Sequence, residues 1–136
     1  MRVIVCLDDR GGMMFNGRRQ SKDRVLIRDV VASLDGKPLA LSPYSAPLFA
    51  ETELPLAVSE TFLDEAGAET VCFVEDRALR PYLDRIDRLV IYRWNRHYPS
   101  DLSLDLDPIA EGFHLGETSE FEGSSHKTVT KEIYWK

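Results

Sequence analysis

The stretch Lys127-Thr-Val-Thr-Lys-Glu-Ile-Tyr-Trp135 decides the fold of this chain. Apart from Lys131, apolar and polar side chains alternate along it, with Trp135 on the apolar side, and this period of two is typical of a strand with one face in water. A second run at residues 112–121 precedes it, and the polar residues 122–125 between the two runs favour a turn. The chain is therefore predicted to finish in an antiparallel hairpin.

Three earlier runs predict strands that are buried on both faces. Residues 2–7, 69–74 and 88–94 are almost continuously apolar, the pattern of strands inside a parallel sheet. Between the first two, apolar residues spaced three and four apart from Ile27 to Leu34 indicate an amphipathic helix. Because strands that alternate with helices pair in parallel, the predicted fold class is α/β: a three-layer mixed sheet, mostly parallel, with a C-terminal antiparallel hairpin.

Local signals set the expected ends of the helices. Ser21 can cap the first helix, and Gly36 can end it. Asp76 can cap a second helix that runs to about Ile86, and Pro81, past its first turn, predicts that this helix is short or kinked. Shorter elements are expected at residues 39–41, 43–50, 54–58 and 59–67.

Length and composition bound the class of protein. With 136 residues, 43% of them hydrophobic, the chain is predicted to form one domain over residues 1–136. Its two cysteines are too few for a disulfide framework. No apolar stretch is long enough to cross a membrane, and the first residues fit a strand rather than a signal peptide. We therefore expect a soluble, cytoplasmic protein with no membrane partner.

Charge is unevenly distributed along the sequence. The chain carries 17 basic and 23 acidic side chains, a formal net charge of −6. Residues 10–28 hold six of the basic side chains and a single acid, Asp23, so this segment is net +5 in a body of net −11. Such a body would repel duplex nucleic acid. The short basic segment instead predicts that a small anionic ligand binds there. The alternative is that these charges form the solvated face of a helix and its loop.

The best candidate binding site lies where that basic segment meets the first helix. A helix N-terminus favours negative charge, so cations gathered there predict an anion held between them and the free N–H groups. The residues expected to bind it are Arg18, Arg19, Lys22 and Arg24. The alternative is that the arginines pair with Asp8, Asp9 or the acidic stretch 101–107. A flexible lid beside the site is predicted at Gly11, Gly12, Met13, Met14 and Phe15, unless these residues fold back onto the core.

Other kinds of chemistry leave no motif in this sequence. His97, His114 and His126 lie far apart in no metal-binding spacing, so neither a metal site nor a zinc-dependent hydrolase or nuclease is expected. Cys6 and Cys72 fall in predicted buried strands and are expected to be inert packing groups. Serine, histidine and aspartate residues are scattered without a recognisable arrangement, and no phosphate-binding or dinucleotide-binding glycine motif is present.

The order of elements resembles that of the dihydrofolate reductase family. Residues 3–13 are similar to that family's first strand and mobile loop, and Asp87-Arg-Leu-Val-Ile-Tyr92 is similar to its penultimate parallel strand. Glu111-Gly-Phe-His-Leu115 and Lys131-Glu-Ile-Tyr-Trp-Lys136 are similar to its closing hairpin. The resemblance implies a dihydrofolate-reductase-like fold, NADPH as cofactor and an acid early in the first helix. Asp23 is the one candidate for that catalytic acid.

Two departures from the family bear on function. Residues 15–23 lack the Pro-Trp pair of the family's first loop. Glu75 and Asp76 follow the strand that ends in paired glycines in the family, and two carboxylates there would repel a diphosphate and keep the backbone away from it. NADPH binding in the family's manner is therefore not expected.

Three functions are compatible with these patterns. The first is a small protein that binds an anionic ligand of phosphate or nucleotide type without the usual reductase machinery. The second is an NADPH-dependent oxidoreductase of a pterin-like or pyrimidine-like substrate, with Asp23 as its proton-relay acid. The third is a partner-binding protein that uses an open sheet edge, which would favour a homo-oligomer.

Overall fold

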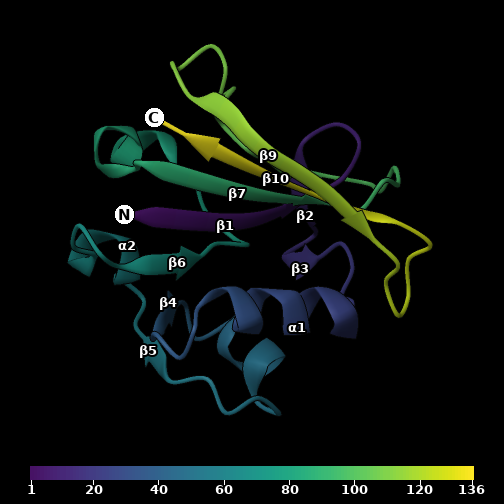
Figure 1. Ribbon diagram of the computed structural model, residues 1–136, viewed down its shortest axis with the longest axis horizontal. Coiled ribbons are helices and arrows are strands. Elements are labelled where there is room, and N and C mark those ends of the chain that lie inside the picture. Colours follow the sequence, from purple (N-terminus) through teal and green to yellow (C-terminus); the bar gives the residue numbers. More distant parts are fainter.

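Five parallel strands and an antiparallel pair form one seven-stranded sheet (Figure 1). The computed structural model describes residues 1–136. The strand order is β5-β4-β6-β1-β7-β10-β9, in which β10 runs antiparallel to both β7 and β9. The strands are β1 (Arg2–Leu7), β4 (Leu39–Leu41), β5 (Leu56–Val58), β6 (Val71–Phe73), β7 (Arg88–Arg93), β9 (His114–Phe121) and β10 (Val129–Trp135). The predicted mixed sheet with a C-terminal hairpin is confirmed.

The two faces of the sheet carry separate hydrophobic clusters, which gives the molecule three layers. Alternate residues of β1 divide between them, because side chains along a strand point to opposite faces. Ile4 packs in the cluster under α1 (Arg24–Ser33) and η1 (Ala46–Phe49), and Val5 packs in the opposite one. The second outer layer consists of the short helices α2 (Phe62–Glu65) and η2 (Arg80–Arg85) and a small sheet.

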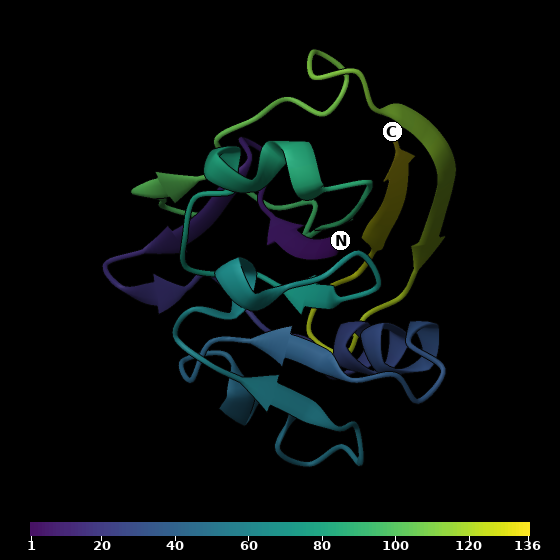
Figure 2. The ribbon, with the colours of Figure 1, turned by 90° about the vertical axis from the view of Figure 1, so that its left-hand side faces the viewer.

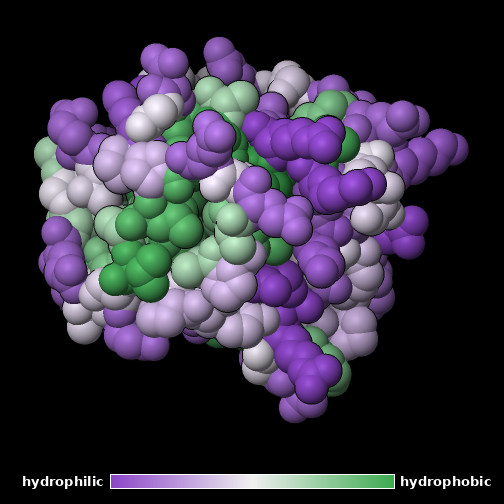
Figure 3. Space-filling model, turned by 90° about the horizontal axis from the view of Figure 1, so that it is seen from below, coloured by the Kyte–Doolittle hydropathy of each residue, from purple (hydrophilic) through white to green (hydrophobic).

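Part of the surface on the α1 side is apolar. Seen from below, where α1 and η1 lie in Figure 1, hydrophobic side chains gather on one part of the surface and hydrophilic ones surround them (Figure 3). None of the helices has the length and apolarity needed to cross a membrane.

A second, three-stranded sheet was not predicted. It consists of β3 (Arg18–Arg19), β2 (Gly12–Phe15) and β8 (Leu102–Ser103), in that order. Met13 and Met14 of β2 are 4% and 5% exposed and belong to the core cluster opposite α1. Most of the segment predicted as a flexible lid is therefore a strand whose two methionines pack on the core, the alternative interpretation of these residues, while Phe15 at its end is 48% exposed.

The helix boundaries differ from the prediction at two places. Asp23, not Ser21, caps α1, since its Oδ1 accepts hydrogen bonds from the N–H groups of Val25 and Leu26. Asp76 caps no helix. The 3-10 helix η2 (Arg80–Arg85) follows instead, with a proline in its first turn, where the missing N–H costs no helical hydrogen bond.

The strand β9 contains a bulge opposite the end of β10. The register between β10 and β9 shifts between Ile133 and Tyr134. Glu117 pairs with Ile133 and Leu115 with Tyr134, so Gly116 is the extra residue, whereas the pairing of β10 with β7 is unbroken. Tyr134 is 7% exposed, because its face of the sheet is covered by the cluster opposite α1, and Trp135 is 39% exposed. This places Trp135 at the surface, beside the amino end of β7.

Candidate functional site

The structure does not gather the predicted basic residues around one cavity. Arg18, Lys22 and Arg24 are exposed and form no ion pair, and they line neither of the two cavities described below. Arg19 is neutralised by Glu75: its Nε lies 2.9 Å from Oε2 and its Nη2 lies 3.1 Å from Oε1. Arg19 thus pairs with Glu75 and not with the expected carboxylates of Asp8, Asp9 or residues 101–107.

The amino end of α1 has no free N–H groups to offer an anion. Asp23 Oδ1 accepts the N–H of Val25 at 2.9 Å and that of Leu26 at 3.2 Å, and its carbonyl oxygen accepts that of Ile27. The N–H of Arg24 donates to Ser124 Oγ at 2.9 Å. The expectation that the first N–H groups of α1 are free to bind an anion was wrong, because they donate to Asp23 and Ser124 of the protein itself.

Asp23 is the centre of a buried polar cluster that joins α1 to the C-terminal hairpin turn. It is 2% exposed, and its carboxylate also accepts the backbone N–H groups of Ser124, Ser125 and His126. Burial by itself would raise the pKa of Asp23, but these hydrogen bonds, the His126 side chain and Leu26 outweigh it and hold that pKa far below its usual range. Asp23 is therefore held as a carboxylate, which does not suit the predicted proton-relay role.

His126 extends this cluster and creates an arrangement that sequence reasoning missed. Its Nδ1 lies 3.0 Å from Asp23 Oδ2, and its Nε2 lies 3.0 Å from Ser21 Oγ and 3.1 Å from the hydroxyl of Tyr98. The ring of Trp94 stacks on the imidazole at 4.5 Å between centroids. A serine, a histidine and an aspartate do come together, contrary to the expectation. Because His126 is 103 residues from Asp23, no sequence motif signals the contact.

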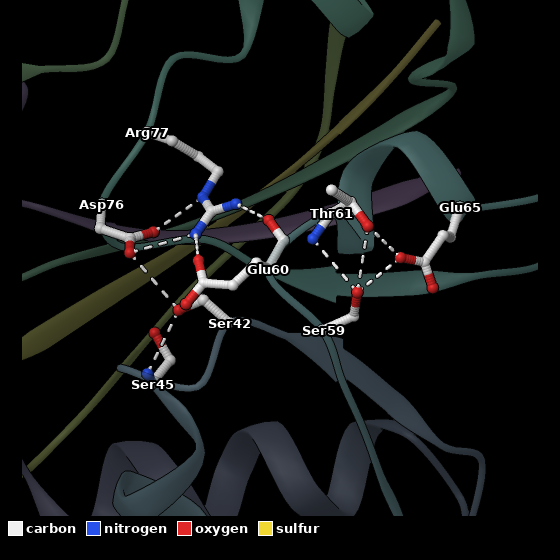
Figure 4. Close-up of polar contacts among 8 residues, drawn as sticks. All are labelled: Ser42, Ser45, Ser59, Glu60, Thr61, Glu65, Asp76 and Arg77. Carbon is white, nitrogen blue, oxygen red and sulfur yellow. Dashed lines mark hydrogen bonds and ion pairs between the residues drawn. The ribbon is translucent and has the colours of Figure 1, made fainter.

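The carboxyl ends of β4, β5 and β6 are closed by a network of charged and hydroxyl side chains (Figure 4). Asp76 accepts hydrogen bonds from Arg77 Nε at 3.0 Å and from Ser42 Oγ at 3.4 Å. The Arg77 guanidinium also donates to the carbonyl oxygen of Glu60, beyond the end of β5. In open α/β sheets, ligands usually bind outside these carboxyl ends. Here that region is bridged by the protein itself.

Glu75, the buried neighbour of Asp76, makes the same edge unsuited to a dinucleotide diphosphate. Glu75 is 8% exposed, and besides Arg19 it accepts a hydrogen bond of 2.7 Å from Ser45 Oγ. The backbone at this strand end is therefore covered by side chains rather than open for close approach. The residues present do not fit the diphosphate of NADPH.

A charged cavity lies at the opposite end of the sheet, where the parallel strands begin. It has a volume of about 350 Å³, and its lining includes Arg2 and Trp135. These residues are next to the two chain termini, which lie on the same side of the molecule (Figure 2). Arg2 of β1 and Arg88 of β7 lie opposite each other in the parallel ladder and both line it. The remaining lining residues are Lys37, Ala68, Glu69, Thr70, Val71 and Asp87.

The two arginines are also shared with a second cavity of about 180 Å³. Lys131 also lines that cavity and is paired with Asp29, its Nζ lying 2.8 Å from Oδ2. No acidic side chain lines this cavity. Neither arginine forms an ion pair, and the Arg88 guanidinium lies 3.7 Å from the centroid of the Trp135 ring. Burial and the charge of Arg88 lower the pKa of Arg2, while Asp87 opposes this shift.

The sequence contains a pattern from which the position of Arg2 and Arg88 at one sheet edge could have been inferred. Arg2 and Arg88 each begin a predicted buried strand, and adjacent parallel strands bring their first residues to the same edge of a sheet. What the sequence could not supply was that β1 and β7 are neighbours.

Other potentially reactive groups are scattered. No three histidine, cysteine, aspartate or glutamate side chains lie close enough together to hold a metal ion. Burial raises the pKa of both thiols, that of Cys72 to about 11, so both cysteines remain protonated and unreactive near neutral pH.

No protein-family model matches the chain, and neither does any curated protein. Among solved structures it is similar to dihydrofolate reductase from Enterococcus faecalis complexed with NADP(H) and RAB-propyl. The TM-score is 0.65 and the sequence identity 12%, over 98% of this chain and 94% of the reductase chain. The fold is that of dihydrofolate reductase. At this identity the likeness extends to the dihydrofolate-reductase-like fold and not to the activity.

Proposed function

We propose that this dihydrofolate-reductase-like protein binds a small anionic ligand, and that the anion is held by Arg2 and Arg88 at the amino ends of β1 and β7. The observation that carries the proposal is the pair of arginines at paired positions of β1 and β7, which line the same two cavities and form no ion pair. Like charges on paired strands destabilise a sheet unless something compensates them. A phosphate or carboxylate between the two groups would provide that compensation through charge-assisted hydrogen bonds.

The shape and composition of the larger cavity support a ligand of nucleotide size or smaller. Its volume of about 350 Å³ lies at the lower end of the range for small-molecule sites. Lys37 adds a further cation, and Trp135 offers an aromatic ring beside Arg88. Glu69 and Asp87 at the rim disfavour a highly charged ligand, so a monophosphate fits better than a triphosphate.

A nicotinamide-dependent reductase is the weaker alternative. Its cofactor would have to place a diphosphate against Glu75 and Asp76, whose side chains already bind Arg19, Ser45, Arg77 and Ser42. The predicted anion site at Arg18, Lys22 and Arg24 also lacks support, since the N–H groups of α1 are occupied and these cations line neither cavity.

Titration calorimetry with variants tests the proposal. Inorganic phosphate and adenosine monophosphate should bind to the wild type, and uncharged adenosine should bind far more weakly. Arg2→Gln and Arg88→Gln should each weaken phosphate binding about tenfold or more, because each removes a charged hydrogen-bond donor.

Arg18→Gln and Arg24→Gln are the matched controls, since they remove exposed, unpaired cations of the segment 10–28. Both should leave phosphate affinity within about twofold, which is the size of a long-range electrostatic effect at physiological salt. Loss of binding in these two variants, with normal binding in Arg2→Gln and Arg88→Gln, would place the anion at α1 and contradict the proposal.

A further inference from the structure

We propose that Ser21, His126 and Asp23 form a nucleophilic triad, in which Ser21 attacks small acyl esters. The contacts run in the required order: hydroxyl to Nε2 at 3.0 Å, then Nδ1 to carboxylate at 3.0 Å. This is the hydroxyl–imidazole–carboxylate sequence that activates a serine in hydrolases of unrelated folds. The site is separate from Arg2 and Arg88, so the inference does not depend on the anion-binding proposal.

The three residues differ in solvent exposure in the way that such a reaction needs. Asp23 and His126 are 2% and 4% exposed, whereas Ser21 is only partly buried and can be reached from solvent. A base that is sheltered from water keeps its hydrogen bonds directed, and a nucleophile at the surface can meet a substrate.

Asp23 is well suited to orient the imidazole. Its carboxylate accepts five backbone N–H groups in addition to Nδ1 of His126, from residues 25, 26, 124, 125 and 126. These donors keep the carboxylate ionised, so Nδ1 carries the proton and Nε2 remains the acceptor for the Ser21 hydroxyl. The stacked Trp94 ring further fixes the plane of the imidazole.

Tyr98 competes with Ser21 for the imidazole. Its hydroxyl lies 3.1 Å from Nε2, and the neutral ring nitrogen has one lone pair for both hydroxyls. Tyr98 therefore weakens the activation of Ser21. Removal of the Tyr98 hydroxyl should leave Ser21 as the one hydroxyl that donates to Nε2.

The reaction is balanced by the three residues and water. Ser21 Oγ forms a bond to the ester carbonyl carbon while its proton moves to His126 Nε2. The bond between that carbon and the alkoxy oxygen breaks, and the departing alcohol takes the proton from Nε2. Water then attacks the acyl-serine, gives its proton to Nε2, and releases the carboxylic acid with return of the proton to Ser21. The exposed cation Lys22, next to Ser21, favours esters that carry a negative charge.

Covalent labelling with a fluorophosphonate probe, followed by peptide mass spectrometry, tests the triad. The wild type should be labelled at Ser21, with loss of fluoride, and Ser21→Ala should not be labelled. His126→Gln should slow labelling by at least tenfold, the lower range for loss of a general base. Tyr98→Phe should label faster than the wild type, because the Nε2 lone pair is then left to Ser21.

Ser100→Ala is the matched control, because Ser100 is an exposed serine without a histidine partner. It should label like the wild type and hydrolyse p-nitrophenyl acetate at the same rate. Absence of label on Ser21 in the folded wild type would overturn the proposal. Labelling of comparable rate in His126→Gln, with an unchanged melting temperature, would do so as well.

Discussion

Asp23 combines three tasks in one buried carboxylate. It caps α1, anchors the turn before β10 and orients His126. Each of these tasks needs the ionised form, since every contact to its two oxygens comes from a donor. Much of the connection between the first helix and the C-terminal hairpin therefore rests on a single side chain.

The pH dependence of stability should reveal this residue. The folded-state pKa of Asp23 lies far below the value of about 3.9 in an unfolded chain, so its contribution is fully present above about pH 5 and is lost as the pH falls below about 4. Asp23→Asn should lose about 3 kcal/mol or more at pH 7, because its amide nitrogen would face N–H donors. It should also lose stability less steeply than the wild type on acidification. Urea unfolding at several pH values measures both effects, and parallel pH profiles would contradict this assignment.

At the scale of elements, the turn between β9 and β10 can approach the amino end of α1 closely because residue 123 is a glycine. A Cβ on Gly123 would lie 2.3 Å from Asp23 Oδ2 and 2.9 Å from the carbonyl oxygen of His126, whereas one on Gly67 would meet only Thr70 Oγ1 at 3.8 Å.

Gly123→Ala should therefore destabilise the protein by about 1–3 kcal/mol, the usual cost of overpacking, and should disturb the amide signals of α1. Gly67→Ala should be neutral or slightly stabilising, since it makes an ordinary contact and stiffens the unfolded chain. Thermal unfolding of the two variants compares them directly. Equal melting temperatures would mean that the turn does not depend on close approach to Asp23.

The sequence predicted the strands of the main sheet, including the three-residue strand β4, but not those of the second sheet. The strand β1 (Arg2–Leu7) matched its apolar run, because five consecutive apolar residues, from Val3 to Leu7, leave a clear signal. The strands β3 and β8 have two residues each, too few for any periodicity. The burial of Tyr134 could not be foreseen either, since the prediction assumed that one face of the hairpin stays in water.

The candidate sites depend on contacts that no local pattern encodes. The pairing of Arg19 with Glu75 joins β3 to the end of β6 across 56 residues, and the pairing of Asp23 with His126 spans 103. Propensities and caps act over a few residues. The sequence therefore identified which charged residues matter, but it did not identify the residues that pair with them.

At the scale of the whole molecule, the two ends of the parallel sheet differ in charge compensation. The carboxyl ends are closed by internal ion pairs such as those of Arg19 and Arg77, and the amino ends leave Arg2 and Arg88 without carboxylate partners. The free edge at β9 is exposed and carries acids, which opposes pairing with a second copy. The proposed anion site thus lies at the end of the sheet opposite to the usual ligand position in open α/β folds.

This asymmetry predicts opposite effects for two arginine substitutions in low-salt buffer without multivalent anions. Arg2→Gln should be as stable as the wild type or up to about 1 kcal/mol more stable, because it relieves repulsion from Arg88. Arg93→Gln should lose about 1 kcal/mol or more, because it leaves Glu132 without its partner at 2.6 Å. Urea unfolding of both proteins provides the comparison, and a clear loss of stability in Arg2→Gln would mean that the arginine pair is already compensated.

The most direct measurement is a crystal structure of the protein soaked in tungstate, a phosphate-like anion whose anomalous scattering locates it unambiguously. The account predicts one tungstate with oxygens within hydrogen-bond distance of the guanidinium groups of both Arg2 and Arg88. An empty cavity there, with tungstate bound instead beside Arg18, Lys22 or Arg24, would contradict it.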